Sequence, residues 1–194
     1  MKKFVPLFGF FLLLAQSLFA QFNLVGSATS STSACYTTLQ ITPASTSQTG
    51  AAWNTTQLDL SNPFILQGQV YLGNNDGGAD GIAFVMQRVS ATAMLTGAGG
   101  GAMGYCGTDP NSATPGGGLT PSLITEFDTW PNNSDPAYDH LSIQKNGWCN
   151  HSVAANQLAG PVQMSATSGN TEDNSIHKYK ITWDPATQVY QVYF

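Results

Sequence analysis

Oxygen ligands and one imidazole are concentrated in a single stretch, residues 126–140, which reads EFDTWPNNSDPAYDH. Four of the eleven acidic residues of the chain lie in this stretch. In a strand, the side chains of Glu126 and Asp128 point to the same face, because side chains alternate along the chain. Two neighbouring carboxylates need a positive partner, yet no Lys or Arg occurs between Arg88 and Lys145. The stretch is therefore a candidate cation site.

The residue types in this stretch indicate which cation would suit it. The Asn132 amide, the Asp135 carboxylate and backbone carbonyls are hard oxygen ligands, which suit calcium. His140 begins the next predicted strand and can return beside Glu126 and Asp128, which would add a site for a transition metal such as manganese. The same composition also fits a solvated acidic loop that binds nothing. Spacing alone leaves both interpretations open.

The elements that would position these residues are strands. From residue 21 onward the chain is rich in Ser, Thr, Gly and Asn, with short apolar runs between turn signals and almost no helical periodicity. This pattern predicts an all-β sandwich or barrel. We expect strands at residues 64–72, 81–87, 122–130 and 140–145, and a hairpin of residues 177–183 and 188–194 around a turn at 184–187.

Three motifs in order resemble those of L-type (legume-type) lectins. Residues 126–140 resemble the family's metal loop, E-x-D-x-[aromatic]-x-N followed by D-P and a His five residues beyond that Asp, with a loop two residues shorter before the D-P. Residues 76–85, DGGADGIAFV, resemble its ADG-[apolar]-AF strand start. Residues 99–105, GGGAMGY, resemble its glycine loop. Residues 50–53 and 58–60 are similar to the opening strands of bacterial L-type lectin modules.

This resemblance implies a concanavalin-like jelly-roll sandwich of two curved antiparallel sheets. It also implies two metal ions, Ca²⁺ and a transition-metal ion such as Mn²⁺. By resemblance, calcium is held by Asp128, the Trp130 carbonyl, Asn132 and Asp135. The transition metal is held by Glu126, Asp128, Asp135 and His140.

The family's sugar contacts map onto the same segments. Asp80 is expected to follow a cis peptide and to accept hydrogen bonds from two sugar hydroxyls, while Asn132 donates its amide. Gly100 or Gly101 offers a backbone N–H, and Trp130 packs against the apolar face of the sugar. The expected function is therefore that of a secreted, calcium-dependent, carbohydrate-binding domain whose partners are glycans, and not that of an enzyme.

Two other functional classes compete with this interpretation. A laminarinase-like glycoside hydrolase has two catalytic glutamates in E-x-D-x-x-E, and Glu126 and Asp128 match its first two positions. Pro131 occupies the place of the second Glu, and a retaining hydrolase needs both carboxyl groups. A surface adhesin module that keeps the fold and the metals without sugar recognition is the third class; glycan binding with and without calcium would separate it from a lectin.

The N-terminus predicts export. Residues 1–20 combine Lys2 and Lys3 with an apolar run and end on Ala20, which is typical of a signal peptide. We therefore expect a secreted or cell-surface protein. Without the leader, four basic and eleven acidic residues leave a net charge of −7, which argues against nucleic acid and anionic membranes as partners.

The remaining expectations concern cysteines, histidines and length. Cys35, Cys106 and Cys149 predict one disulfide and one unpaired thiol in an oxidising compartment, with the pairing open. His151 and His177 have no carboxylate nearby in sequence and are interpreted as carrying no site function. Residues 21–194 are expected to form one domain that continues beyond this β-rich end by roughly 40 or more residues.

Overall fold

The structure is a computed structural model that describes residues 22–33, 35–89, 97–107, 118–132 and 134–194. The predicted leader, residues 1–20, lies outside the described residues. Eleven strands and one short 3-10 turn, η1 (Gly100–Ala102), make up the described regular structure, which confirms the all-β class. Within the described ranges, no helix is long and apolar enough to cross a membrane.

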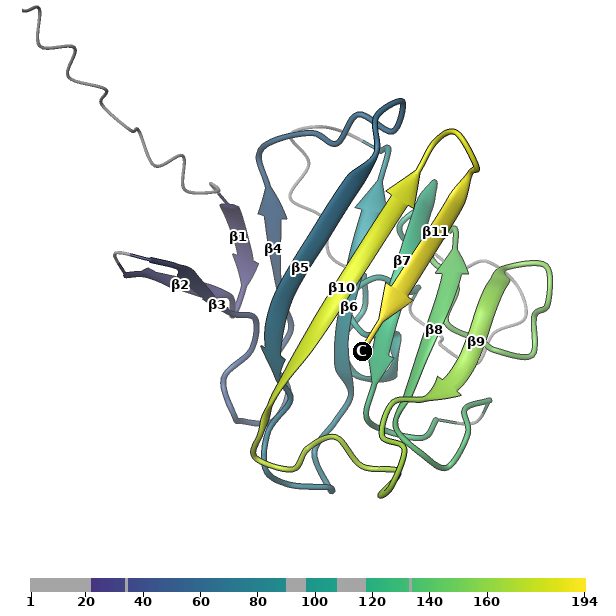
Figure 1. Cartoon of the computed structure of the whole chain (residues 1–194). Helices are drawn as coiled ribbons and strands as arrows, with labels where there is room; N and C mark the ends of the chain where they lie inside the picture. The colour runs from purple at the N-terminus through teal and green to yellow at the C-terminus, as the bar shows by residue number, and fades with distance from the viewer. Residues whose placement is uncertain (1–21, 34, 90–96, 108–117, 133) are drawn as a thin grey trace, which may run out of the picture.

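Two antiparallel sheets form the layers of a sandwich (Figure 1). The first sheet has the order β6-β7-β8-β9, with bounds Gly81–Gln87, Ser122–Asp128, His140–Lys145 and Gln157–Gln163. The second has the order β11-β10-β5, with bounds Val189–Tyr193, Ile176–Asp184 and Phe64–Tyr71. Two strand pairs lie beside them: β1 (Phe22–Gly26) with β4 (Gly50–Asn54), and β2 (Thr29–Thr32) with β3 (Thr37–Gln40).

The two sheets pack through alternate side chains of β7. The ring of Phe127 lies 6.0 Å from that of Tyr179 on β10 and 5.4 Å from that of Phe194, measured between centroids. The Thr125 hydroxyl hydrogen-bonds to the Tyr190 hydroxyl of β11 at 2.7 Å. Because side chains alternate, Glu126 and Asp128 point away from this interface, to the other face of the first sheet. The predicted jelly-roll sandwich and the shared face of the two carboxylates are thus confirmed.

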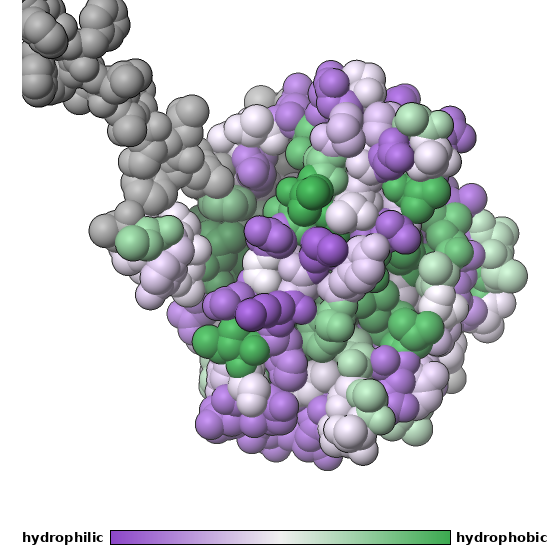
Figure 2. Space-filling view, viewed as in Figure 1, coloured by the Kyte–Doolittle hydropathy of each residue, from purple (hydrophilic) through white to green (hydrophobic). Residues whose placement is uncertain are grey.

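Residues along β5 alternate between partly buried and exposed positions, and the exposed ones lie on the outer face of the second sheet. Ile65 and Tyr71 are exposed there, as is Ile176 on β10. Figure 2 shows this side of the molecule, with apolar side chains in separate groups between polar ones. This alternation is typical of an antiparallel sheet with one face toward solvent.

Most strand boundaries agree with the sequence-based expectation. β6 matches its predicted range, and the hairpin of β10 and β11 turns where Asp184 accepts hydrogen bonds from the Ala186 N–H (2.9 Å) and the Thr187 hydroxyl (2.8 Å). β7 ends two residues earlier than predicted. The Asp128 carboxylate accepts the Trp130 N–H at 2.8 Å, and this turn ends the strand.

Two expectations about strands were wrong or incomplete. Residues 58–60 form no strand; Asp59 instead holds a turn by accepting hydrogen bonds from Ser61 (N–H, 3.0 Å) and the Asn62 amide (2.8 Å). β9 was not predicted, because it contains Gly160 and Pro161, two residues that are depleted in strands. β9 pairs with β8, although the register of this pairing is irregular, and the pairing makes the segment a strand.

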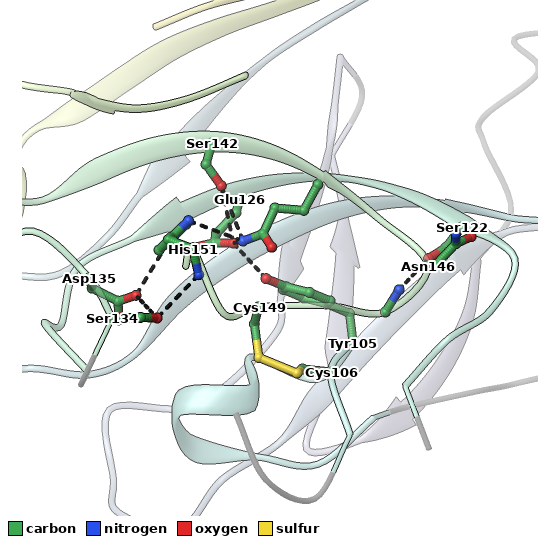
Figure 3. Close-up of a disulfide and its surroundings, with 12 residues drawn as sticks. Tyr105, Cys106, Ser122, Glu126, Ser134, Asp135, Ser142, Asn146, Cys149 and His151 are labelled. Atoms are coloured by element: carbon green, nitrogen blue, oxygen red, sulfur yellow. Dashed lines mark hydrogen bonds and ion pairs between the residues drawn. A yellow bond between two sulfur atoms is a disulfide. The ribbon is translucent and has the colours of Figure 1, made fainter. Parts of the chain in front are cut away.

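One disulfide connects two loops over the first sheet. Cys106 and Cys149 are bonded, with their Cα atoms 5.9 Å apart (Figure 3). Cys35 is an exposed free thiol. The bond joins the glycine-rich segment 97–107 to the loop that follows β8. Both cysteines belong to a buried cluster with Tyr105 and Ile124, so the predicted single disulfide is part of the core.

Candidate functional site

The pairing of β7 with β8 brings the predicted metal ligands together. In this register Asp128 lies opposite His140, and Glu126 lies opposite Ser142. Glu126 and His140 are each 1% exposed, and Asp128 is 3% exposed. The expected return of His140 beside the two carboxylates is confirmed. Such complete burial of carboxylates requires that each be paired or hydrogen-bonded.

The two oxygens of Glu126 have different surroundings. Oε2 accepts hydrogen bonds from the Tyr105 hydroxyl (2.5 Å), the Gln144 amide (2.7 Å) and the Ser142 hydroxyl (3.3 Å). Oε1 is 3.3 Å from His140 Nε2. Burial by itself raises the pKa of Glu126, but hydrogen bonds from the imidazoles of His140 and His151 outweigh it and bring the pKa to about 2. Glu126 is therefore ionised, with one oxygen free to face the imidazoles.

The pKa of Asp128 is shifted in the opposite direction. Its burial, and then the negative charge of Glu126, raise the pKa of Asp128 to about 9. Within the described part of the chain, no Lys or Arg forms an ion pair with Glu126, Asp128 or Asp135. The carboxylates of this cluster therefore cannot all ionise together, and a bound cation would relieve the repulsion between them.

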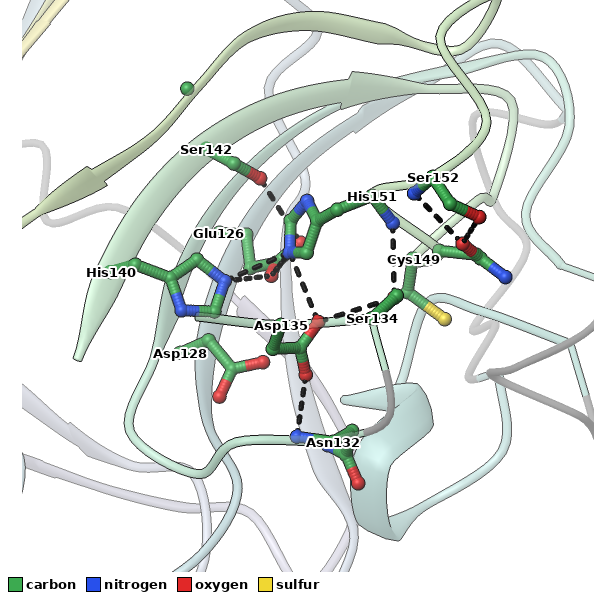
Figure 4. Close-up of polar contacts among 12 residues, drawn as sticks. Glu126, Asp128, Asn132, Ser134, Asp135, His140, Ser142, Cys149, His151 and Ser152 are labelled. Carbon is green, nitrogen blue, oxygen red and sulfur yellow. Dashed lines mark hydrogen bonds and ion pairs between the residues drawn. The ribbon is translucent and has the colours of Figure 1, made fainter. Parts of the chain in front are cut away.

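His151 also lies in this cluster, although sequence reasoning gave it no site function. Its Nε2 lies 2.8 Å from His140 Nε2, 3.3 Å from Glu126 Oε1 and 3.3 Å from Asp135 Oδ1 (Figure 4). His151 comes from the loop after β8, so its partners are close in space and not in sequence. Burial lowers the pKa of His151, but the hydrogen bond to Glu126 and the charges of Glu126 and Asp135 raise it by more.

His177 has a carboxylate partner as well, contrary to expectation. Its Nε2 is 3.0 Å from Asp173 Oδ1, four residues earlier, and 3.0 Å from the Thr171 carbonyl. Asp173 is 46% exposed in its side chain. This pair lies outside the cluster and has the exposure of an ordinary surface contact.

Two sets of side chains in the cluster could each hold a metal ion. Glu126, His140 and His151 form one, and Asp128, Asp135 and His140 form the other; within each set the ligand atoms lie within 4.8 Å of one another. All four residues predicted for the transition metal are present across the two sets. His151 is the member that sequence reasoning missed.

The loop after β7 is held by the same carboxylates. Asp128 accepts the Trp130 N–H at 2.8 Å, and Asp135 Oδ2 accepts the Asn132 N–H at 2.7 Å. Trp130 is 41% exposed, so part of this residue is open to solvent. Figure 4 shows Asn132 beneath Asp135, joined to it by this hydrogen bond.

The residues predicted to contact sugar also converge. The Ala79–Asp80 peptide is cis, as expected, and the Asp80 carbonyl accepts the Thr129 N–H at 3.0 Å. The Asp80 carboxylate hydrogen-bonds to the Asn132 side chain, and burial raises the pKa of Asp80. A Cβ on Gly101 would lie 2.7 Å from both polar atoms of the Asn132 amide, and one on Gly100 would lie 3.9 Å from Asp80 Oδ2. A side chain at position 101 would therefore displace the Asn132 amide, whereas Gly100 is favoured by its left-handed backbone (φ +63°).

A further buried carboxylate supports the loop before Asp80. Glu172 is 4% exposed, and a Cβ on Gly78 would lie 2.7 Å from its Oε1. Burial, and then the charge of Asp139, raise the pKa of Glu172 to about 7. Its Oε2 atom has no hydrogen-bond partner within the described residues. Glu172 was not singled out from the sequence, because it lies far from the three motifs along the chain.

The arrangement does not fit a retaining hydrolase. Glu126 is enclosed by three donors and two imidazoles, and Pro131 lies beyond the end of β7, where the second catalytic Glu would be needed. The carboxylate of Asp80, the amide of Asn132 and the indole of Trp130 are instead groups that can contact a neutral polyol.

The chain is similar to known proteins of one family. The family model described as a legume lectin beta-barrel domain matches residues 14–194. The structure of a lectin from Bauhinia forficata in complex with GalNAc is similar, with a TM-score of 0.57 and 18% identity over 92% of this chain and 73% of that one. The structure of basic winged bean lectin with Tn-antigen has a TM-score of 0.53 and 17% identity over 90% of this chain and 77% of that one. These two likenesses show the shared fold. The family match shows that this chain belongs to the legume lectin domain family and is a carbohydrate-binding lectin domain, not an enzyme.

Proposed function

We propose that this chain is a secreted, calcium-dependent lectin domain that binds sugar at Asp80, Gly100, Gly101, Trp130 and Asn132. The observation that carries the proposal is the meeting of three segments that are separate in sequence. Asp80, the glycine loop and Asn132 lie in mutual contact, and Asn132 is attached to the metal-binding cluster through Asp135.

The chemistry of these groups suits a sugar. The Asp80 carboxylate accepts hydrogen bonds from two neighbouring hydroxyls, and the Asn132 amide donates to another. A backbone N–H of the glycine loop adds a further donor, because no side chain blocks the approach to it. The exposed face of Trp130 packs against C–H groups of the ring.

The cluster fits the metals that the family implies, since buried carboxylates converge there without a Lys or Arg ion pair in the described residues. Calcium would be held by Asp128, the Trp130 carbonyl, Asn132 and Asp135, and the transition metal by Glu126, Asp128, Asp135 and His140. A bound cation supplies the positive charge that allows these carboxylates to ionise together. Asp128 and Asp135 themselves position the loop, through their bonds to the N–H groups of Trp130 and Asn132.

The related structures suggest which sugars to test first. The Bauhinia lectin was solved with GalNAc and the winged bean lectin with Tn-antigen, so GalNAc-containing glycans are the first candidates for this chain. Secretion is supported by the predicted leader at residues 1–20 and by the Cys106–Cys149 disulfide, which is typical of oxidising compartments.

Glycan binding with and without calcium tests the proposal. We expect binding that is lost on exhaustive chelation and restored by Ca²⁺. Asp128→Ala should abolish metal and sugar binding together, because this carboxylate belongs to the cluster and holds Trp130. Asp173→Ala, which removes a half-exposed carboxylate outside the cluster, is the matched control. Sugar binding that survives chelation would overturn calcium dependence, and metal binding without any glycan ligand would favour the adhesin alternative.

A further inference from the structure

His151 is unexplained by the ligand set that the family resemblance implies. That set contains one imidazole, His140, whereas the structure places a second imidazole against it. The His151 side chain is only 4% exposed, and its Nε2 faces Glu126, Asp135 and His140 together. A buried nitrogen directed at three potential metal ligands calls for a specific role.

The distances among the donor atoms match those around one metal ion. The two Nε2 atoms are 2.8 Å apart, and each is 3.3 Å from Glu126 Oε1. With metal–ligand bonds of about 2.0–2.1 Å, adjacent ligands are about 2.9 Å apart in an octahedral shell and about 3.3 Å apart in a tetrahedral one. Asp135 Oδ1, 3.3 Å from His151 Nε2, extends the same pattern.

The backbone around His151 is held in place. Two residues earlier, Cys149 is bonded to Cys106, and the His151 N–H donates to the Ser134 hydroxyl at 3.2 Å. Next to it, the Ser152 N–H donates to Asn150 Oδ1 at 2.9 Å. Gln157 of β9 hydrogen-bonds to the His151 ring. Outer hydrogen bonds of this kind orient imidazole ligands in metal sites.

We propose that His151 is a second imidazole ligand of the transition-metal centre, beside His140 and Glu126, and that it turns the preference of this centre from manganese toward zinc-like ions. This inference rests on the proposed function, in that it takes the cluster to hold a metal. Imidazole suits zinc, cobalt, nickel and copper, whereas manganese prefers carboxylate and water ligands. Replacing a water by an imidazole therefore favours the first group.

A surface hollow gives solvent access to this side of the centre. Its lining includes Ser134, Asp135, Asn150 and His151, and none of the proposed sugar contacts. Ions can therefore reach the His151 side of the cluster without crossing the surface formed by Asp80 and the glycine loop.

The test counts imidazole ligands directly. The full chain is stripped with chelator and loaded with one equivalent of Cu²⁺, and pulsed EPR counts the coordinated imidazoles. We expect two in the wild type and one in His151→Ala, with two again in His177→Ala, the control that removes the histidine outside the cluster. By competition titration, His151→Ala should weaken Zn²⁺ and Co²⁺ binding by about tenfold or more and Mn²⁺ binding by less than about threefold.

Three results would overturn the inference: one imidazole in the wild type, unchanged Zn²⁺ affinity in His151→Ala, or no transition-metal binding by the wild type. The wild-type count needs no variant, so misfolding of His151→Ala would not weaken the test. Calcium-dependent glycan binding, measured on the same samples, reports separately on the proposed function. A lectin with a one-imidazole centre would retain that function and refute this inference.

Discussion

Replacing Gly101 by Ala should weaken sugar binding while leaving Glu126, Asp128 and His140 in place. The new Cβ would lie 2.7 Å from Oδ1 and Nδ2 of Asn132 and 2.8 Å from its Cγ, closer than real Cβ contacts. The partly exposed Asn132 amide has to swing away, and its hydrogen bond to Asp80 is lost. One or two hydrogen bonds between the Asn132 amide and the sugar are then lost, at about 0.5–1.5 kcal/mol each. A total of about 1–2 kcal/mol corresponds to about a 5- to 30-fold loss of affinity.

Isothermal titration with the best glycan, at saturating calcium, measures this loss. The free energy of unfolding should stay within about 0.5 kcal/mol of the wild type, because the displaced side chain ends near solvent. Gly77→Ala is the matched control, since the nearest atom to its new Cβ, Asn75 Oδ1, lies at an ordinary 3.4 Å. Equal sugar affinity in Gly101→Ala and Gly77→Ala would refute the placement of the sugar against Asn132.

Two further predictions follow from the carboxylates near this loop. Asp80→Asn should keep the calcium content and the fold but remove sugar binding, because an amide cannot accept hydrogen bonds from two hydroxyls as the carboxylate does. Glycan binding and metal analysis of the same variant measure this. An unaltered glycan profile would place the site elsewhere. The pKa of Glu172 is raised to about 7 in the folded state from 4.5, so the folded protein keeps a proton that the unfolded chain has released. The stabilisation of the folded state by protonated Glu172 is therefore fully present below pH 4.5 and is lost as the pH rises through about 7. This contribution to the free energy of unfolding is on the order of a few kcal/mol, and Glu172→Gln should remove it from the pH dependence of urea unfolding. Parallel profiles for the two proteins would contradict it.

Much of the site could be predicted because its first ligands are adjacent along regular elements. The alternation of β7 puts Glu126 and Asp128 on one face, and a short return places His140 opposite Asp128. These relations depend only on the period of a strand and on the order of two neighbouring strands. The turn at Asp184 was likewise predictable, since Asp, Pro and Thr hold turns through their own side chains.

Other features depend on contacts between distant segments, for which local patterns carry no signal. His151 was missed because it reaches the cluster from a loop, and the bond between Cys149 and Cys106 helps to hold that loop. β9 was missed because pairing with β8 outweighs the low strand propensity of Gly160 and Pro161.

The sequence by itself determined the all-β class, the order of the three motifs and most residues of the candidate metal cluster. The all-β class follows from side-chain alternation and turn chemistry. The motifs and the ligand set follow from the resemblance to L-type lectins. Only the tertiary structure decided which cysteines pair, that Gly101 lies against Asn132, and that His151 faces Glu126. The physical reason is that these contacts close large loops, and the packing of the whole domain selects them among many closures of similar entropic cost.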